Sequence, residues 1–291
     1  MHASLKRLRH AFEYAAFRLV GGIVWLLPLE TASQLSGAGW RLVAPHLRRH
    51  DRAIANIAAA FPEMPAKQRE AIARGMWENL GRSFAEFFHL EEIVGGGRIE
   101  LEDSPEFACA RAAAPRAVVC GMHTGNWELT VVAALRSGFK PAGVYQKITN
   151  PLVDRYVTAR RAALYPGGLL EKSPRTAIKL MRIAKDGGCV AFLADQRETR
   201  GGVSVPFFGK PAPSTPFPAL VAETHNLPLF AACVRRVKGA RFSIRAAHVA
   251  LSRTGDREAD VAATTAALQA AYETFVREAP EQWMWAHRRW G

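Results

Sequence analysis

Apolar and polar residues follow two different patterns along this chain, and the change falls near residue 100. Before it, apolar residues recur at three- and four-residue steps, as on one face of a helix. The clearest example is the range 66–90, which keeps Ile72, Met76 and Leu80 in register. The pattern therefore predicts a helical N-terminal region over residues 1–100, which ends at consecutive glycines.

Beyond residue 100, short apolar runs alternate with helical patterns. The predicted strands are 117–122, 142–146, 190–194, 229–234 and 242–249. The predicted helices are 129–137, 151–163, 176–185, 217–224 and 260–278. Such alternation is typical of an α/β fold in which helices flank a mostly parallel central sheet on both faces. We therefore expect one α/β domain over residues 101–291, with the helical N-terminal region packed against it.

The N-terminal region also contains a segment suited to a membrane. The cations Lys6, Arg7 and Arg9 precede an apolar stretch near 11–29, of which only the 11 residues from 19 to 29 are free of charge. Those residues are too few to cross a bilayer core, which takes about 20. We expect an uncleaved, membrane-associating segment, either a single anchor or a helix in the membrane plane. A cleaved signal peptide and an ordinary core helix are the alternatives.

The charge of the chain predicts that its partner is anionic. The formal net charge is +13 and the pI is about 10.1, which suits an anionic membrane surface, nucleic acid, or an acidic or phosphorylated substrate. The basic residues are spread along the chain and match no nucleic-acid-binding motif, so we expect no nucleic acid. A basic membrane- or nucleic-acid-binding protein without catalysis remains the alternative from another class.

The four cysteines give little indication of chemistry. They are scattered singly, without a CxxC pair, and Cys120, Cys189 and Cys233 lie within apolar runs. We expect buried thiols in a reducing compartment, and no metal site built from them.

The most informative stretch is His-Thr-Gly-Asn-Trp-Glu at 123–128, between a predicted strand and a predicted helix. On a continuous helix His123 and Glu128 would point about 140° apart, so they meet only if His123 lies in the loop and the Glu128 side chain folds back. An imidazole paired with a carboxylate is a competent general base for a hydroxyl. A structural, hydrogen-bonded histidine is the alternative, and a metallohydrolase is disfavoured because no HExxH-like spacing occurs.

Further motifs surround this stretch in a recognisable order. They are Asn56-Ile57 through Phe61-Pro62-Glu63, His123 to Glu128, Asn150-Pro151 with Asp154 and Arg161, Asp195-Gln196, Val205 to Gly209, and Pro280 to Trp285 with His287, Arg288 and Arg289. Together they closely resemble the lipid A biosynthesis acyltransferases. These are the Kdo-dependent lauroyl and myristoyl transferases within the His-x4-Asp/Glu acyltransferase superfamily.

The resemblance implies transfer of a fatty acyl group from acyl carrier protein to a hydroxyl of a lipid A precursor. It places the reaction on the cytoplasmic face of the bacterial inner membrane. It also implies that the reaction needs no cofactor and no metal. A lysophospholipid or an aminolipid is the alternative acceptor. His123 would act as the general base, with Glu128 orienting it and supporting its positive charge. Direct transfer is favoured, because no serine or cysteine nucleophile accompanies the pair.

The resemblance also gives roles to residues outside the pair. We expect Arg161, rather than its neighbour Arg160, to bind the developing oxyanion or a substrate phosphate. Asp195 would order Arg161 or a substrate group, with helix capping as the alternative. The expected catalytic set is His123, Glu128, Arg161 and Asp195. The expected substrate-binding set is Asn126, Gln196, Phe207 and Phe208, with the two phenylalanines lining an acyl-chain groove or else packing in a core loop.

The C-terminal cluster of Trp283, Trp285, His287, Arg288, Arg289 and Trp290 has two interpretations. Aromatic rings beside cations suit a lipid headgroup interface. The same residues would also serve to fix the end of the chain to the core, so we leave them outside the catalytic set.

Overall fold

The N-terminal region is helical in the computed structural model, which describes residues 2–102, 105–113 and 116–290. The helices are α1 (His2–Leu26), α2 (Leu29–Val43), α3 (Arg48–Ala60), α4 (Ala66–Glu86) and α5 (Leu90–Gly95). Pro28 separates α1 from α2, since a proline has no N–H to continue a helix. The helix expected over 66–90 is confirmed, although a 3-10 turn at Phe87–His89 divides its end into α4 and α5.

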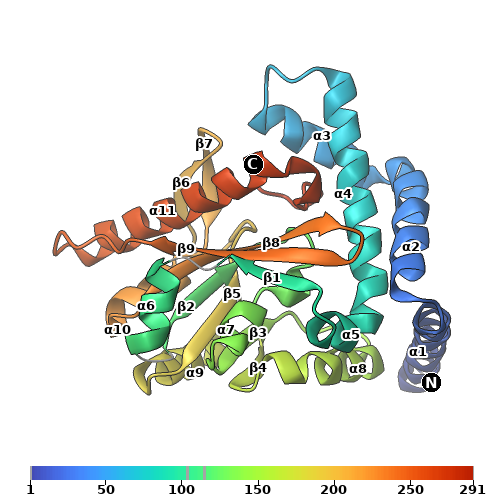
Figure 1. The fold of residues 1–291 in the computed structure, drawn as a ribbon, viewed down its shortest axis with the longest axis horizontal. Helices are drawn as coiled ribbons and strands as arrows, with labels where there is room; N and C mark the ends of the chain where they lie inside the picture. Colours follow the sequence, from blue (N-terminus) through green and yellow to red (C-terminus); the bar gives the residue numbers. More distant parts are fainter. Residues whose placement is uncertain (1, 103–104, 114–115, 291) are drawn as a thin grey trace.

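A seven-stranded sheet forms the centre of the molecule (Figure 1). Its strands are β1 (Ile99–Glu102), β2 (Val118–Gly121), β3 (Pro141–Tyr145), β4 (Gly168–Glu171), β5 (Cys189–Leu193), β8 (Leu229–Lys238) and β9 (Arg241–Val249). They are ordered β1-β9-β8-β2-β5-β3-β4, and only the β8–β9 pair is antiparallel. The α/β fold with a mostly parallel central sheet is therefore confirmed.

Helices join these strands and cover both faces of the sheet. They are α6 (Pro105–Ala113), α7 (Val132–Arg136), α8 (Pro151–Arg161), α9 (Pro174–Lys185), α10 (Phe217–His225) and α11 (Arg257–Glu278). Alternate residues of β2 enter opposite cores: Val118 and Cys120 pack with α9, α10 and α11, while Val119 packs with α5, α6 and α7. This period of two is what a strand buried on both faces requires.

The sequence pattern missed the strands at the margins. β1 and β4 form the two edges of the sheet, and each has only four residues. The hairpin of β6 (Val203–Phe207) and β7 (Lys210–Ser214) stands apart from the main sheet. Short edge strands bury little surface, so their apolar patterning is weak, and β7 contains two prolines that disfavour a strand prediction.

The N-terminal helices are joined to the α/β part at specific positions. Asn150 caps α8 through its side-chain oxygen, and its amide donates to the carbonyl of His10 at 2.8 Å and to Glu13 at 3.0 Å in α1. The Asn-Pro motif thus begins α8 and also fixes α1 on it. Within the described ranges, no helix combines the length and the apolar character needed to span a bilayer.

Candidate active site

His123 and Asp195 form the centre of the site. β2 and β5 are adjacent parallel strands, so their carboxyl ends meet, and each residue lies just beyond the end of its strand. The imidazole Nδ1 lies 2.8 Å from Oδ1 of Asp195, and the backbone N–H of His123 donates to Oδ2 at 2.9 Å. The indole N–H of Trp283 also donates to Oδ2, at 2.8 Å. The carboxylate therefore fixes both the ring and the backbone of His123.

The charge state of Asp195 follows from these contacts. Asp195 is 2% exposed, and burial alone would raise its pKa. The charge of His123 and the hydrogen bonds from His123 and Trp283 have the opposite effect, and together they outweigh burial. They hold the pKa of Asp195 well below its usual range. An ionised carboxylate only accepts hydrogen bonds, so the proton of the neutral imidazole resides on Nδ1 and the lone pair on Nε2.

Gln196 and His287 lie on the Nε2 side of this imidazole. The amide nitrogen of Gln196 is 3.1 Å from Nε2 of His123 and 3.1 Å from Nε2 of His287. Its two hydrogens allow one hydrogen bond to each ring. Burial, followed by the nearby His123, lowers the pKa of His287 to about 4, so His287 is neutral at neutral pH. Gln196 thus caps the atom of His123 that would accept a proton.

Glu128 occupies a different position from the one expected. Both of its carboxylate oxygens accept from Arg161, from Nε at 2.7 Å and from Nη2 at 2.5 Å. The carboxylate that contacts His123 belongs to Asp195, so the assignment of Glu128 to the imidazole and of Asp195 to Arg161 is corrected. Arg160 instead lies 3.5 Å from Glu91 and beside Tyr156, so of these two neighbours only Arg161 lines the cavity beside His123.

The physical reason for this exchange is the conformation of the 123–128 loop. After Gly125, whose φ is +51°, the chain enters a 3-10 turn at Trp127–Leu129 rather than an α-helix. This turn directs Glu128 towards α8, which carries Arg161, and away from His123. Desolvation opposes the charge of Arg161, but the adjacent Glu128 outweighs it and raises the pKa of Arg161.

The loop itself is held by the N-terminal helices and the C-terminal segment. Asn79 and Ser83 of α4 each donate to the carbonyl of Gly125 at 2.8 Å. Asn126 is fully buried, donates to Glu86 at 3.0 Å and accepts from the backbone N–H of Glu128. Its expected role in substrate binding is therefore corrected: its amide is used in fixing the loop to α4.

A cavity of about 610 Å³ opens beside His123, a size within the ~300–1,000 Å³ typical of ligand sites. Its walls come from the carboxyl ends of β3, β4 and β5, from α9 and α10, and from the loop after β2. Apolar members of the lining include Val144, Leu169, Leu180, Phe192 and Phe217, and polar members include Gln196, Glu128 and Arg161.

Phe207 and Phe208 lie outside the lining of this cavity, which corrects their expected role in an acyl-chain groove. They pack instead with Trp283, Trp285 and Trp290. Arg289 is also buried there and donates to Pro213, Ser214 and Gln269. The C-terminal cluster therefore fixes the end of the chain to the core, although its members Trp283 and His287 also reach the site.

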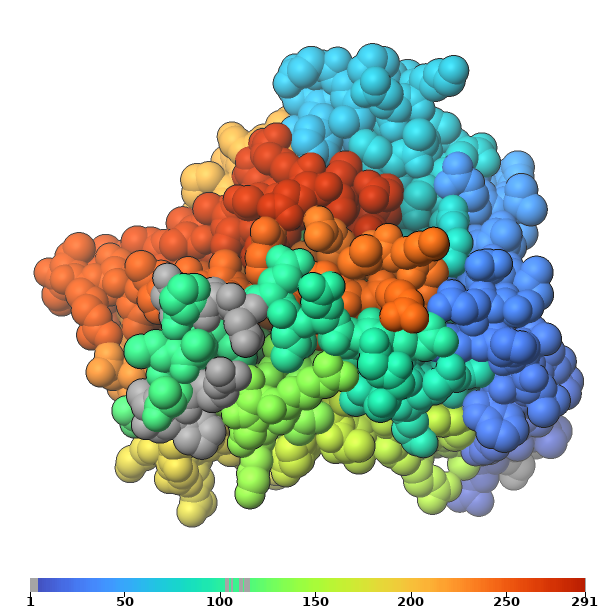
Figure 2. Space-filling model, viewed as in Figure 1, coloured from blue at the N-terminus to red at the C-terminus, as the bar shows by residue number. Residues whose placement is uncertain are grey.

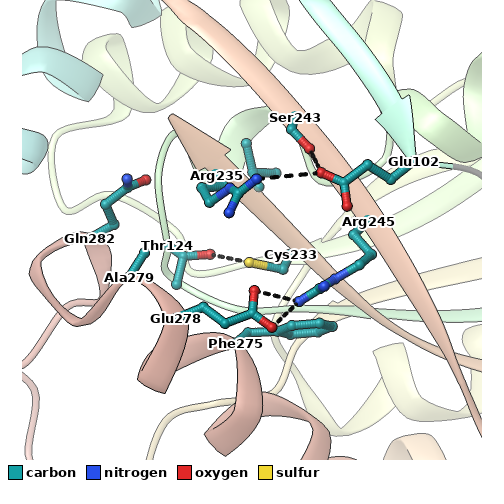
Figure 3. A pocket seen from close by; sticks show the side chains of 11 residues that line it. Glu102, Thr124, Cys233, Arg235, Ser243, Arg245, Phe275, Glu278, Ala279 and Gln282 are labelled. Atoms are coloured by element: carbon teal, nitrogen blue, oxygen red, sulfur yellow. Dashed lines mark hydrogen bonds and ion pairs between the residues drawn. The ribbon is translucent and has the colours of Figure 1, made fainter. Parts of the chain in front are cut away.

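A second, much smaller hollow lies behind the loop, next to Thr124 and Cys233 (Figure 3). Its volume is about 20 Å³, roughly that of a single water. Burial raises the pKa of the Cys233 thiol to about 11, so this sulfur is a neutral hydrogen-bonding partner of Thr124 rather than a nucleophile. All four cysteines are free, and Cys120, Cys189 and Cys233 are buried as expected.

Four residues that contribute to the site lie outside the predicted site residues. Trp283 and His287 were recognised within the C-terminal motif but kept outside the catalytic set. Glu86 and Asn79 carry no sequence signal beyond their places in a long helix. The aromatic and basic composition around residue 283, beyond the end of the last predicted helix, is the available indication that this segment makes a specific contact.

A histidine–carboxylate pair beside a large cavity, at the carboxyl edge of a mostly parallel sheet, is an arrangement typical of the site of an α/β enzyme. The chain belongs to the bacterial lipid A biosynthesis acyltransferase family, whose sequence model matches residues 2–291. A phosphatidylinositol mannoside acyltransferase of Mycobacterium tuberculosis (strain ATCC 25618 / H37Rv) is 25% identical over 257 residues, which cover 81% of this chain and 75% of that protein. The protein is thus an acyltransferase.

Proposed function

We propose that this acyltransferase moves a fatty acyl group from acyl carrier protein to a hydroxyl of a lipid A precursor, at the cytoplasmic face of the inner membrane. The family supports an acyl donor and a lipid acceptor. One observation supports the chemistry most directly: His123, whose Nδ1 is held by Asp195, lines a cavity of about 610 Å³ that has several apolar side chains in its wall. Burying a saturated chain there would contribute about 0.8 kcal/mol per CH₂.

The reaction begins when the acceptor hydroxyl displaces the amide of Gln196 from Nε2 of His123. His123 then takes the hydroxyl proton as the oxygen attacks the thioester carbonyl, and Asp195 stabilises the imidazolium that forms. A tetrahedral oxyanion results. When it collapses, the C–S bond breaks, the new ester C–O bond remains, and the leaving thiolate takes the proton from His123.

Arg161 is our proposed cation for the oxyanion or for a phosphate of the acceptor. Glu128 occupies its Nε and Nη2, whereas Nη1 makes no hydrogen bond to any residue that the structure describes. Arg161 also lines the cavity. Glu128 would hold the guanidinium in one orientation, so that Nη1 could bind the oxyanion or the phosphate without rotation of the side chain.

The surface of α1 and α2 supports association with a membrane. Both helices lie along one side of the molecule (Figure 1, Figure 2). Their exposed large apolar side chains include Leu8, Phe12, Leu19, Ile23, Trp25, Leu26, Leu42 and Val43, and Phe12 is 76% exposed. Exposed apolar side chains beside Lys6, Arg7 and Arg9 suit a helix lying in the plane of an anionic lipid surface.

A second acceptor is supported by the mycobacterial relative, which is named for acylation of a phosphatidylinositol mannoside. The same site chemistry would serve a hydroxyl of a glycolipid or a lysophospholipid, because these acceptors differ from a lipid A precursor in the headgroup. Competition between a lipid A precursor and these lipids, with one radiolabelled acyl donor, separates the two candidates.

The decisive experiment supplies purified protein with acyl carrier protein loaded with fatty acids of different lengths, and with a lipid A precursor in mixed micelles. We expect an acylated product by mass spectrometry, and its loss in the His123→Ala variant. Undiminished transfer by a folded His123→Ala protein would overturn the mechanism. Transfer only to other lipids would overturn the proposal that a lipid A precursor is the acceptor.

A further inference from the structure

The outer face of α9 carries an unusual concentration of positive charge. Its four charged residues, Arg175, Lys179, Arg182 and Lys185, are all basic and exposed. In the part of the chain that the structure describes, the only ion pair that these four residues make is that of Arg182 with Asp186, at 3.8 Å. In the middle of this face is Ile178, an apolar side chain that is 73% exposed. A helix face with cations of one sign and almost no acidic partner suits an acidic protein surface.

The inner face of the same helix belongs to the active site. Thr176, Ala177 and Leu180 line the cavity beside His123. Lys172, which precedes α9, lines it too, and so does Arg197. A partner on the outer face would therefore sit next to the cavity, separated from its interior by the thickness of one helix.

A lipid surface fits this face less well than a protein does. The many exposed apolar side chains that would enter a membrane are on α1 and α2. In Figure 1, α9 lies at the lower left, whereas α1 and α2 lie along the right-hand side of the molecule. A single isoleucine provides little apolar area for insertion, whereas the charge of α9 matches that of an acidic protein.

We infer that the outer face of α9 is the docking surface for an acidic carrier protein that delivers the acyl group. This inference rests on the function proposed above and adds where the donor binds. The carrier would lie against Arg175, Ile178 and Lys179, while its thioester-bearing arm passes Lys172 into the cavity. No bond forms or breaks at this surface, so the surface should affect only the binding of the acyl donor.

The test compares two donors with the same acyl group. One is the acyl carrier protein, and the other is an acyl-N-acetylcysteamine thioester, which has no protein part. The variant is Arg175→Glu/Lys179→Glu, in which both side chains are exposed and make no ion pair or hydrogen bond to any residue that the structure describes. The matched control is Lys67→Glu/Lys210→Glu, which changes the net charge equally at exposed positions on α4 and β7, away from α9 (Figure 1).

We expect the α9 variant to raise the KM for the acyl carrier protein at least about tenfold, because like charges would then oppose each other across the interface. Transfer from the small thioester should stay within about twofold of the original protein, which also shows that the variant is folded. The control variant should behave as the original protein with both donors. Raising the salt concentration should weaken carrier use by the original protein more than by the α9 variant.

Two outcomes would overturn the docking surface and leave the proposed function intact. One is an unchanged KM for the carrier in the α9 variant. The other is weaker flotation of that variant with anionic phospholipid vesicles together with unchanged use of the carrier, which would assign the face to lipid. If the original protein transfers no acyl group from either donor, the proposed function fails instead.

Discussion

Asp195 holds the imidazole of His123 through Nδ1, at 2.8 Å, although the two residues are 72 positions apart in the chain. Glu128 is only five residues away in sequence and pairs with Arg161. The two carboxylates therefore make different contributions. Asp195 controls the tautomer and charge of the proposed base, and Glu128 controls the orientation of a cation in the cavity wall.

Replacing Asp195 with asparagine should lower kcat by about 10²–10⁴-fold with little change in KM. Asparagine can donate an N–H to Nδ1, which would place the imidazole proton on Nε2 and remove the lone pair from the reacting side. Steady-state kinetics with acyl carrier protein measure this, with circular dichroism as the control for folding. A kcat within twofold of the original would contradict the assignment.

Replacing Glu128 with glutamine should act mainly on stability and on use of the acceptor. The pair with Arg161 is bidentate and largely shielded from water, and leaving one member of such a pair unmatched costs about 3–5 kcal/mol. Urea unfolding measures the change. The double variant Glu128→Gln/Arg161→Met is the control: it should recover part of the lost stability, because no unpaired charge remains.

The pH dependence of activity separates the two carboxylates further. Because Asp195 pairs with His123 and Glu128 pairs with Arg161, Glu128→Gln should leave the acid limb of the kcat profile in place, whereas Asp195→Asn should displace it. An equal displacement in both variants would restore Glu128 as the partner of His123.

His287 should make the fold sensitive to acid in a defined window. Its pKa is lowered to about 4 in the folded protein, first by burial and then by His123, while an unfolded histidine has a pKa of about 6.5. Between these values the unfolded chain binds more protons, so the free energy of unfolding falls as the pH falls from about 6.5 to 4. The loss due to this group should be about 3 kcal/mol.

The variant His287→Asn isolates that contribution. Urea titrations of both proteins at pH 7 and at pH 4.5 should show a smaller loss of stability for the variant. Identical losses in the two proteins would show that other groups cause the acid sensitivity.

Gly125→Ala should disrupt the catalytic loop. The residue has a φ of +51°, and an added Cβ would overlap the carbonyl oxygen of Val234. Left-handed backbone with a side chain costs about 1–3 kcal/mol before any overlap is counted. We expect both a lower melting temperature and a large loss of transfer. Gly138→Ala is a suitable comparison, since it also has a positive φ, of 84°, but nothing lies within 4 Å of its added Cβ.

Much of this molecule could be predicted from local sequence patterns. The apolar runs at β2, β5 and β8 are continuous because both faces of these strands are buried, so they were recognised as strands. His123 was recognised because it lies between such a run and a turn. Strand β4 and the β6–β7 hairpin were missed because exposed or proline-containing strands lack this signal.

The sequence by itself determined which residue types the site has available: a histidine after one strand, an aspartate after another, and an arginine near the end of a helix. Only the tertiary structure decided which of them meet. Strand order places β5 next to β2, which brings Asp195 to His123, and a 3-10 turn directs Glu128 to Arg161. Both outcomes depend on packing between segments far apart in the chain, and side-chain spacing along a single segment carries no information about such packing.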